Sequence, residues 1–359
     1  MKYYNFSGLD FFSTQNKFKK NSQIPTHILY GTAKDVELTI VIPVYKRTDF
    51  IAGAIQSALN QKTNHRFQVL VLDNTTENDD IRHIVEGFLD DRVAYGKNEK
   101  NIGMFGNWNR CFELVKSPWV TMLHDDDRLK PEYVETMFQT LNTYSNLPVV
   151  EIGVAHDYIN ELNQITTYAE IDNSIKVVGA QDFFFDINSI HICGAFFNRD
   201  AVIRLGGFDD SFYPASDSNL ICKLAVSGIA IKVSKRLSEY RIAQNESLNP
   251  STMGGCVSYM YTQMHVLYTT CNLELPYWFY RIALNVTINN AKKSIETFWG
   301  GLDIDYKKID ADIHYREPSK FDSFLYRLVR KFYTDGKFCK INIFHPIFKI
   351  NCLLERRQK

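Results

Sequence analysis

Three consecutive aspartates follow a short apolar run in the first half of the chain. In the stretch SPWVTMLHDDDRLKP, residues 117–131, Asp125, Asp126 and Asp127 come directly after His124. Adjacent carboxylates repel one another, and burying one without a partner is costly. A solvated loop that caps the following helix would relieve the repulsion. A divalent cation would relieve it as well, because Mg²⁺ and Mn²⁺ prefer carboxylate oxygens and complete their coordination with phosphates.

The composition is that of a globular protein. Of the 359 residues, 45% are apolar and 23% are charged, which leaves room for one large domain or two ordinary ones. The formal net charge is zero, so the chain lacks the overall basic field that holds nucleic acid, and we expect no nucleic-acid partner. Seven scattered cysteines without a CxxC pair favour reduced thiols in a cytoplasmic protein over a disulfide framework or a zinc ribbon.

We expect neither a secretion signal nor a membrane span. Residues 1–20 lack an apolar core segment, and no run approaches the roughly 18 apolar residues of a spanning helix. Any contact with a membrane is therefore expected to be peripheral, at the inner face of the plasma membrane.

Apolar, β-branched runs alternate with helical patterns over residues 37–142. We expect strands at 37–45, 67–74 and 118–124, a short strand and a loop within 92–103, and helices at 50–61, 77–89, 104–115 and 130–142. This alternation predicts an α/β fold with a mostly parallel sheet and helices on both faces. Ligands bind such sheets beyond the carboxyl ends of the strands. Three of these ends carry polar groups, at residues 43–46, 73–74 and 124–127, and this topology gathers them on one edge.

The motifs along this part of the chain suggest a family. The order TIVIPVY, VLVLDN, NIGMFGNWN and WVTMLHDDD resembles that of family 2 glycosyltransferases with the Rossmann-like GT-A fold, of the bacterial surface-polysaccharide type. The resemblance covers about residues 37–247. It implies an N-terminal extension over 1–35, a GT-A domain over 36–250 whose nucleotide-binding half ends near 145, and a helical, basic and aromatic C-terminal region over 251–359.

The resemblance implies a nucleotide-sugar donor, with a UDP-sugar expected. It assigns the nucleotide site to Pro43, Val44, Tyr45, Asp73, Asn101, Gly103, Asn109 and Asp126. Asp73 would accept a hydrogen bond from the uracil N3–H or its equivalent, and Asp126 would bind the ribose hydroxyls. Asp127 would hold Mn²⁺ or Mg²⁺ at the diphosphate, and Asp125 is the alternative metal ligand. On the residues alone, Pro43 ends a strand, and Asp73 and Asn101 each begin a simple turn.

Asp217 is the expected general base. Transfer in one in-line step inverts the anomeric carbon and needs a carboxylate to take the proton of the attacking hydroxyl. The segment GGFDDSFYPASDSNLICKLA resembles the acceptor side of the family, with Ser216–Asp217 in place of the usual Glu–Asp. The alternative role of Asp217 is to cap the helix that follows. Arg241 would approach the diphosphate or form a surface ion pair. The histidine that the family places shortly after it is replaced by Ala243 or Gln244.

The C-terminal tail is basic and aromatic. Residues 316–359 hold 11 Lys and Arg against 4 Asp and Glu, which suits either an anionic membrane surface or a helical bundle on the catalytic domain. We expect an inverting, metal-dependent glycosyltransferase that acts on a polyprenyl-diphosphate-linked or other surface-polysaccharide precursor. The alternatives are a nucleotidyltransferase acting on sugar phosphates and a catalytically degenerate scaffold in a glycan-assembly complex.

Overall fold

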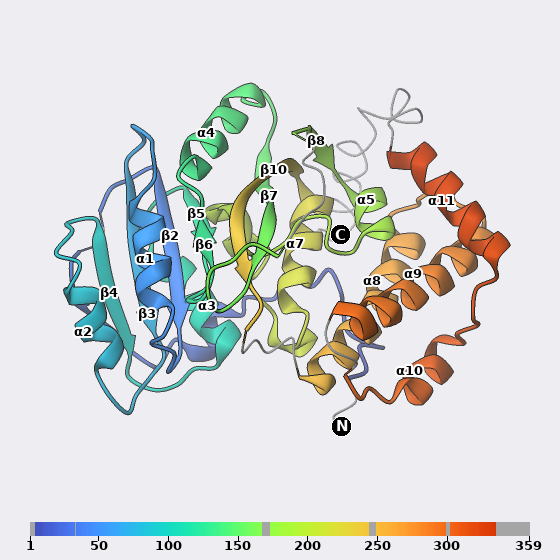
Figure 1. Cartoon of the computed structure of the whole chain (residues 1–359), viewed down its shortest axis with the longest axis horizontal. Helices are drawn as coiled ribbons and strands as arrows, with labels where there is room; N and C mark the ends of the chain where they lie inside the picture. The colour runs from blue at the N-terminus through green and yellow to red at the C-terminus, as the bar shows by residue number, and fades with distance from the viewer. Residues whose placement is uncertain (1–3, 33, 167–172, 244–248, 299–301, 335–359) are drawn as a thin grey trace, which may run out of the picture.

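The computed structural model describes residues 4–32, 34–166, 173–243, 249–298 and 302–334 (Figure 1). Its strands are β1 (Thr26–Tyr30), β2 (Leu38–Val44), β3 (Phe67–Asp73), β4 (Val93–Asn98), β5 (Trp119–Met122), β6 (Arg128–Leu129), β7 (Val149–Ile159), β8 (Ile175–Val178), β9 (Ala195–Asn198) and β10 (Ile229–Arg241). They form one sheet in the order β1-β4-β3-β2-β5-β9-β7-β10-β6, with β8 paired to β10. Strands β2, β3, β4, β5, β7 and β10 run in one direction, and the others run against them. The predicted mostly parallel sheet is confirmed.

The parallel block β4-β3-β2-β5 follows from its sequence. Its two central strands, β2 and β3, are mostly apolar, and every residue in both is buried, as expected for strands covered on both faces. The register pairs Val44 with Asp73 and Val41 with Met122. The carboxyl ends of these strands therefore lie at one edge of the sheet.

Helices cover both faces of the sheet. They are η1 (Phe18–Asn21), α1 (Ile51–Leu59), α2 (Asp80–Glu86), α3 (Met104–Leu114), α4 (Tyr133–Thr143), α5 (Ala180–Phe185), α6 (Arg199–Arg204), η2 (Asp210–Phe212), α7 (Ser216–Ser227), α8 (Pro250–Thr270), α9 (Tyr277–Phe298), α10 (Tyr306–Ile313) and α11 (Lys320–Thr334). One apolar core joins α1, α2 and α4 to the sheet. A second core, on the opposite face, contains α3, α6 and α7 and continues into α8 and α9.

The helices after residue 250 gather at one end of the molecule. Figure 1 shows α8–α11 at the end opposite α2 and β4. The helices α8 and α9 lie in the region from 251 onward that the sequence predicts to be helical. In the part of the chain that the structure describes, none of the helices is both long enough and apolar enough to cross a bilayer.

The N-terminal segment, residues 4–32, packs along the domain. Its strand β1 pairs antiparallel with β4 and adds an edge to the sheet. Arg110 of α3 is buried and donates hydrogen bonds to the carbonyl oxygens of Asn21 and Ile24, at 2.7 and 2.8 Å. Further upstream, Phe11 stacks on Tyr259 of α8, with ring centroids 6.0 Å apart. The segment therefore contacts both the nucleotide-side helix α3 and the C-terminal helix α8.

Candidate active site

The carboxyl ends of the parallel strands bring the predicted site residues to one edge. The backbone N–H of Asn74, after β3, donates to the carbonyl oxygen of Val44, at the end of β2. The backbone N–H of Lys46 donates to Thr75 Oγ at 2.7 Å. The end of β10 reaches the acid motif after β5, because the backbone N–H of Arg241 donates to Asp127 Oδ1 at 2.9 Å.

The three aspartates are buried and are held by different partners. Their exposed fractions are 5% for Asp125, 3% for Asp126 and 0% for Asp127. Arg47, in the loop after β2, pairs with the first two: its guanidinium lies 2.5 Å from Asp125 Oδ1 and 2.7 Å from Asp126 Oδ2. Asp127 instead faces His124, whose Nδ1 lies 3.2 Å from Asp127 Oδ2. The motif is therefore not a solvated loop.

Arg241, at the end of β10, donates hydrogen bonds to the acid motif. Its Nε donates to the carbonyl oxygen of Asp126 at 2.8 Å, and its guanidinium lies over the ring of Phe50, 4.2 Å from the centroid. Its remaining nitrogens donate to Asn160 and Asn163, and the side chain is 2% exposed. Arg241 therefore fixes the backbone of the acid motif rather than forming a surface ion pair.

His124, Asp126 and Asp127 converge in a way that fits a divalent cation. One possible ligand atom from each lies within 4.8 Å of the other two. Nε2 of His124 is buried and has no hydrogen-bond partner among the described residues. Two carboxylates and an imidazole form an oxygen-rich donor set that suits Mg²⁺ or Mn²⁺. The residues present therefore fit the metal that the sequence predicts.

Burial and mutual repulsion separate the pKa values of the three acids. Burial raises the pKa of Asp125 to about 6, although Arg47 opposes the rise. Burial, together with repulsion from Asp127, raises the pKa of Asp126. Burial also acts on Asp127, but the hydrogen bond and the charge of His124 outweigh it, so the pKa of Asp127 is lowered. Asp127 is therefore the carboxylate of the motif that most readily stays charged.

The residues expected around the base lie at the ends of β2 and β3. Pro43 and Val44 are buried, whereas Tyr45 is exposed. Asp73 is fully buried, and its two oxygens accept hydrogen bonds from the Thr75 backbone N–H and the Tyr95 hydroxyl, both at 2.7 Å. Burial raises the pKa of Asp73, and these two hydrogen bonds oppose the rise. Asp73 thus begins a turn through its hydrogen bond from Thr75, the role expected from its sequence position alone. The sequence did not predict its hydrogen bond with Tyr95.

Asn101 and Gly103 shape the loop that leads into α3. Oδ1 of Asn101 accepts from the backbone N–H of Gly103 at 2.8 Å and from Nδ2 of Asn74 at 2.8 Å. Gly103 has φ +78°, a left-handed conformation that favours glycine. Asn101 is exposed, so it stands at the surface of the edge that carries the acids.

Asn109 connects α3 to the acceptor side of the chain. It is buried, and its amide group both accepts from the backbone N–H of Phe208 at 2.8 Å and donates to the carbonyl oxygen of Phe208 at 2.9 Å. A Cβ on Gly207 would lie 2.4 Å from Asn109 Oδ1, so the close approach requires glycine there. Both the oxygen and the nitrogen of the Asn109 side-chain amide are therefore hydrogen-bonded to the backbone of Phe208.

Asp217 lies in the first turn of α7, one residue after the fully buried Ser216. Because the helix cap is Ala215, Asp217 is not the cap residue. Its side chain is half-buried, and burial raises the pKa of its carboxyl. Hydrogen bonds from the helix backbone and the charge of His124 oppose this rise. A raised pKa strengthens Asp217 as a base.

Arg47 is a site residue that the sequence reasoning missed. Arg47 was visible in IPVYKRTDF as a basic residue directly after a strand, on the same edge as the acids, and that position was the available signal. Trp108 is buried and stacks on the imidazole of His124, with ring centroids 5.2 Å apart. His191 is half-buried, and its Nδ1 accepts from the backbone N–H of Cys193.

Comparison with known proteins agrees with this geometry. Residues 39–206 match the family described as Glycosyl transferase family 2. Staphylococcus aureus TarS, residues 1–349 in complex with UDP-GlcNAc, has a similar structure, with a TM-score of 0.53, 12% identity and 73% of each chain covered. The mostly parallel sheet therefore has the fold of the GT-A glycosyltransferases. Residues 39–206, slightly less than half of the chain, are thus similar to glycosyl transferase family 2.

Two bacterial relatives are similar over shorter stretches. The GalNAc(5)-diNAcBac-PP-undecaprenol beta-1,3-glucosyltransferase of Campylobacter jejuni is 29% identical over 109 residues, 30% of this chain and 35% of that protein. The putative colanic acid biosynthesis glycosyl transferase WcaA of Escherichia coli is 26% identical over 125 residues, 34% of this chain and 43% of that protein. The chain spans about a third of the length of the first curated relatives that it matches, 31% and 35%.

Proposed function

We propose that this chain is an inverting, metal-dependent glycosyltransferase. It transfers one sugar from a nucleotide-sugar, with a UDP-sugar as the expected donor, to a hydroxyl group of a lipid-linked or surface-polysaccharide precursor. The observation that carries the proposal is the convergence of His124, Asp126 and Asp127 at the carboxyl edge of the parallel strands. Buried carboxylates in that position favour a ligand that brings positive charge and phosphate oxygens.

The acid motif would stabilise the leaving group. Asp127 and Asp126, with His124, would hold Mn²⁺ or Mg²⁺, which offsets the negative charge that develops on the departing diphosphate. Arg241 keeps these residues in place through the backbone of Asp126 and the carboxylate of Asp127. Arg47 adds a positive charge beside Asp125 and Asp126. Electrostatic groups fixed before the reaction are usually the largest contribution to such a rate enhancement.

Asp217 would act on the acceptor. In a single in-line displacement, the acceptor oxygen forms a bond to the anomeric carbon as the bond to the diphosphate oxygen breaks. The carboxylate of Asp217 takes the hydroxyl proton, and no covalent link to the protein forms. The raised pKa of Asp217 favours this proton transfer, because a stronger base is a better proton acceptor at neutral pH.

The C-terminal helix α11 supports a peripheral contact with an anionic membrane. Phe321, Phe324 and Leu328 lie at helical spacing and are exposed by 67%, 54% and 42%. The neighbouring Arg327 and Lys331 are also exposed. Exposed aromatic and basic side chains on one helix suit the surface of an anionic bilayer, where a lipid-linked acceptor would lie. Residues 335–359, the rest of the basic tail, lie outside the described residues.

A donor panel tests the proposal. UDP-glucose, UDP-galactose, UDP-GlcNAc, UDP-GalNAc, GDP-mannose and a dTDP-sugar are incubated with the protein, with Mn²⁺ or with EDTA, and the released nucleotide is measured. We expect UDP release from one UDP-sugar, dependent on Mn²⁺. Release of pyrophosphate from UTP and a sugar 1-phosphate would favour a nucleotidyltransferase. If UDP does not bind to the protein, either with Mn²⁺ or with EDTA, the result would favour the catalytically degenerate scaffold.

A further inference from the structure

A polar pocket lies beside the acceptor loop, and Gly103 and Asn109 of the expected nucleotide site also line it. Its volume is about 280 Å³, near the lower end of small-molecule sites. Its lining includes Lys17 and Lys20 from the N-terminal segment, Met104 and Phe105 at the start of α3, and Asp210 and Tyr213 from the acceptor loop. Lys17, Lys20, Asp210 and Tyr213 fall outside residues 39–206, the part that matches the family.

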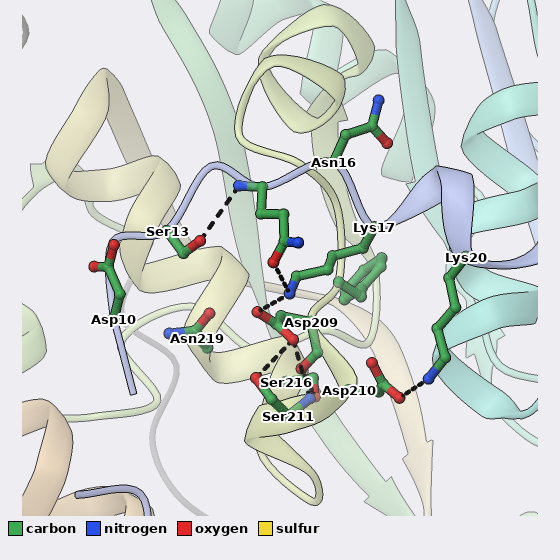
Figure 2. Close-up of polar contacts among 12 residues, drawn as sticks. Asp10, Ser13, Asn16, Lys17, Lys20, Asp209, Asp210, Ser211, Ser216 and Asn219 are labelled. Atoms are coloured by element: carbon green, nitrogen blue, oxygen red, sulfur yellow. Dashed lines mark hydrogen bonds and ion pairs between the residues drawn. The ribbon is translucent and has the colours of Figure 1, made fainter. Parts of the chain in front are cut away.

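The N-terminal segment builds one wall of this pocket. Figure 2 shows Lys17 and Lys20 extending from that segment toward Asp209 and Asp210. Lys17 Nζ lies 3.0 Å from Asp209 Oδ2, and Lys20 pairs with Asp210. The backbone N–H of Lys17 also donates to the carbonyl oxygen of Gly206 at 3.0 Å. The charges in the wall are therefore balanced, and the pocket offers both donors and acceptors rather than an excess of positive charge.

The same acceptor loop is fastened to the helix of the expected base. The hydroxyl of Ser216 donates to the carbonyl oxygen of Asp209 at 2.6 Å, and Ser216 directly precedes Asp217. A fixed loop therefore runs from the pocket to the start of α7.

An aromatic layer connects the pocket to the acid motif. Tyr213 contacts Phe105, with ring centroids 6.2 Å apart; Phe105 contacts Trp108 at 5.1 Å, and Trp108 stacks on His124 at 5.2 Å. Phe105, which lines the pocket, and Trp108 therefore form the packed layer between the pocket and His124.

We propose that this pocket binds a sugar residue of the acceptor glycan, next to the residue whose hydroxyl is glycosylated. The inference rests on the proposed function and deepens it. A pyranose ring has an apolar face and a rim of hydroxyl groups. Tyr213 and Met104 offer apolar surface to the face, and the Lys20–Asp210 pair offers charged donors and acceptors to the hydroxyls. The N-terminal segment would thus set acceptor selectivity.

Binding of simple glycosides tests this site. Methyl glycosides of glucose, galactose, GlcNAc, GalNAc and glucuronic acid are titrated into the full chain and followed by saturation-transfer NMR. We expect at least one of them to bind. Met104→Trp, which fills the pocket from its exposed rim, and Lys20→Ala should each weaken that binding by about tenfold, the scale of one or two lost charge-assisted contacts. The matched control Lys19→Ala alters an exposed lysine that does not line the pocket, and it should bind like the wild type.

The outcomes separate this site from the nucleotide site. Asp127→Ala should lose metal-dependent UDP binding and keep glycoside binding, whereas Met104→Trp should keep UDP binding, which also shows that it is folded. Failure of all five glycosides to bind, or equal binding by wild type, Met104→Trp and Lys20→Ala, overturns the sugar subsite. If the wild type does not bind UDP with Mn²⁺, the proposed function is overturned instead.

Discussion

Arg47 Nη1 lies 2.7 Å from Asp126 Oδ2, so an internal cation already pairs with a carboxylate of the candidate metal site. The same guanidinium pairs with Asp125. Asp126 is also one of the three residues whose ligand atoms converge within 4.8 Å. A divalent cation bound at this site would therefore compete with Arg47 for Asp126.

Removing this competitor should strengthen metal binding. We expect Arg47→Gln to bind Mn²⁺ up to about fivefold more tightly than the wild type, because a partly exposed ion pair contributes up to about 1 kcal/mol. Electron paramagnetic resonance of free Mn²⁺ during a titration measures the affinity. Arg66→Gln alters an exposed arginine away from the acids and serves as the control. Unchanged or weaker Mn²⁺ binding by Arg47→Gln would contradict the competition.

Replacement of Asp217 separates catalysis from donor binding. We expect Asp217→Asn to lower turnover by about 10²–10⁴, the usual contribution of a general base, while UDP binding with Mn²⁺ stays near the wild-type value. Product formation and calorimetric titration of UDP measure the two effects. Asp200→Asn, on the exposed side of α6, is the matched control. Near-native turnover of Asp217→Asn would contradict the role of Asp217 as the general base.

The amide group of Asn109 should stabilise the fold. In Asn109→Ala, the backbone N–H and carbonyl of Phe208 lose their partner in a buried environment. We expect the free energy of unfolding to fall by about 2–4 kcal/mol, since each unsatisfied buried group costs about 1–3 kcal/mol. Urea denaturation measures this loss, with exposed Asn142→Ala as the control. Native stability combined with weak UDP binding would point instead to the direct nucleotide contact that the resemblance implies.

Glu151 should make stability depend on pH. It lies on β7 with 0% exposure, and both its carboxyl oxygens lack hydrogen-bond partners among the described residues. Burial raises its pKa well above the ordinary value. A raised pKa in the folded state means that stability is fully present below the unfolded pKa, about 4.3, and is lost as the pH rises through the folded pKa.

Glu151→Gln removes this titration. We expect the free energy of unfolding of the variant, relative to the wild type, to increase steadily from pH 5 to pH 9. Urea denaturation across that range measures it, and Glu161→Gln, an exposed change, should show no such trend. A difference between variant and wild type that stays constant with pH would show that Glu151 is not forced to its neutral form.

The sequence predicts most of the nucleotide half because its signals are local. The apolar runs of β2 and β3 and the helical spacing in α1 and α3 specify their elements without distant contacts. The acid motif is found for the same reason, since Asp125–Asp127 directly follow a recognisable strand. The order of strands then places them on one edge.

Long-range contacts account for what the sequence did not predict. The pairing of Arg47 with Asp125 depends on the path of a loop 78 residues away in the chain. The N-terminal segment shows no clean periodicity, because Phe6 and Phe11 pack individually against Phe212 and Tyr259 rather than along one helix face. Strand β9 begins only at Ala195, although the apolar run starts earlier, because pairing with β5 and β7 decides where it begins.

Titration calorimetry of UDP, with and without Mn²⁺, tests the central claim most directly. The buried carboxylates after β5 are proposed to hold a divalent cation together with the diphosphate of the donor. The wild type should bind UDP with Mn²⁺ and lose most of that binding in EDTA, and Asp127→Asn should not respond to Mn²⁺. Equal UDP affinity with and without Mn²⁺, or an undiminished response to Mn²⁺ in Asp127→Asn, would contradict the account.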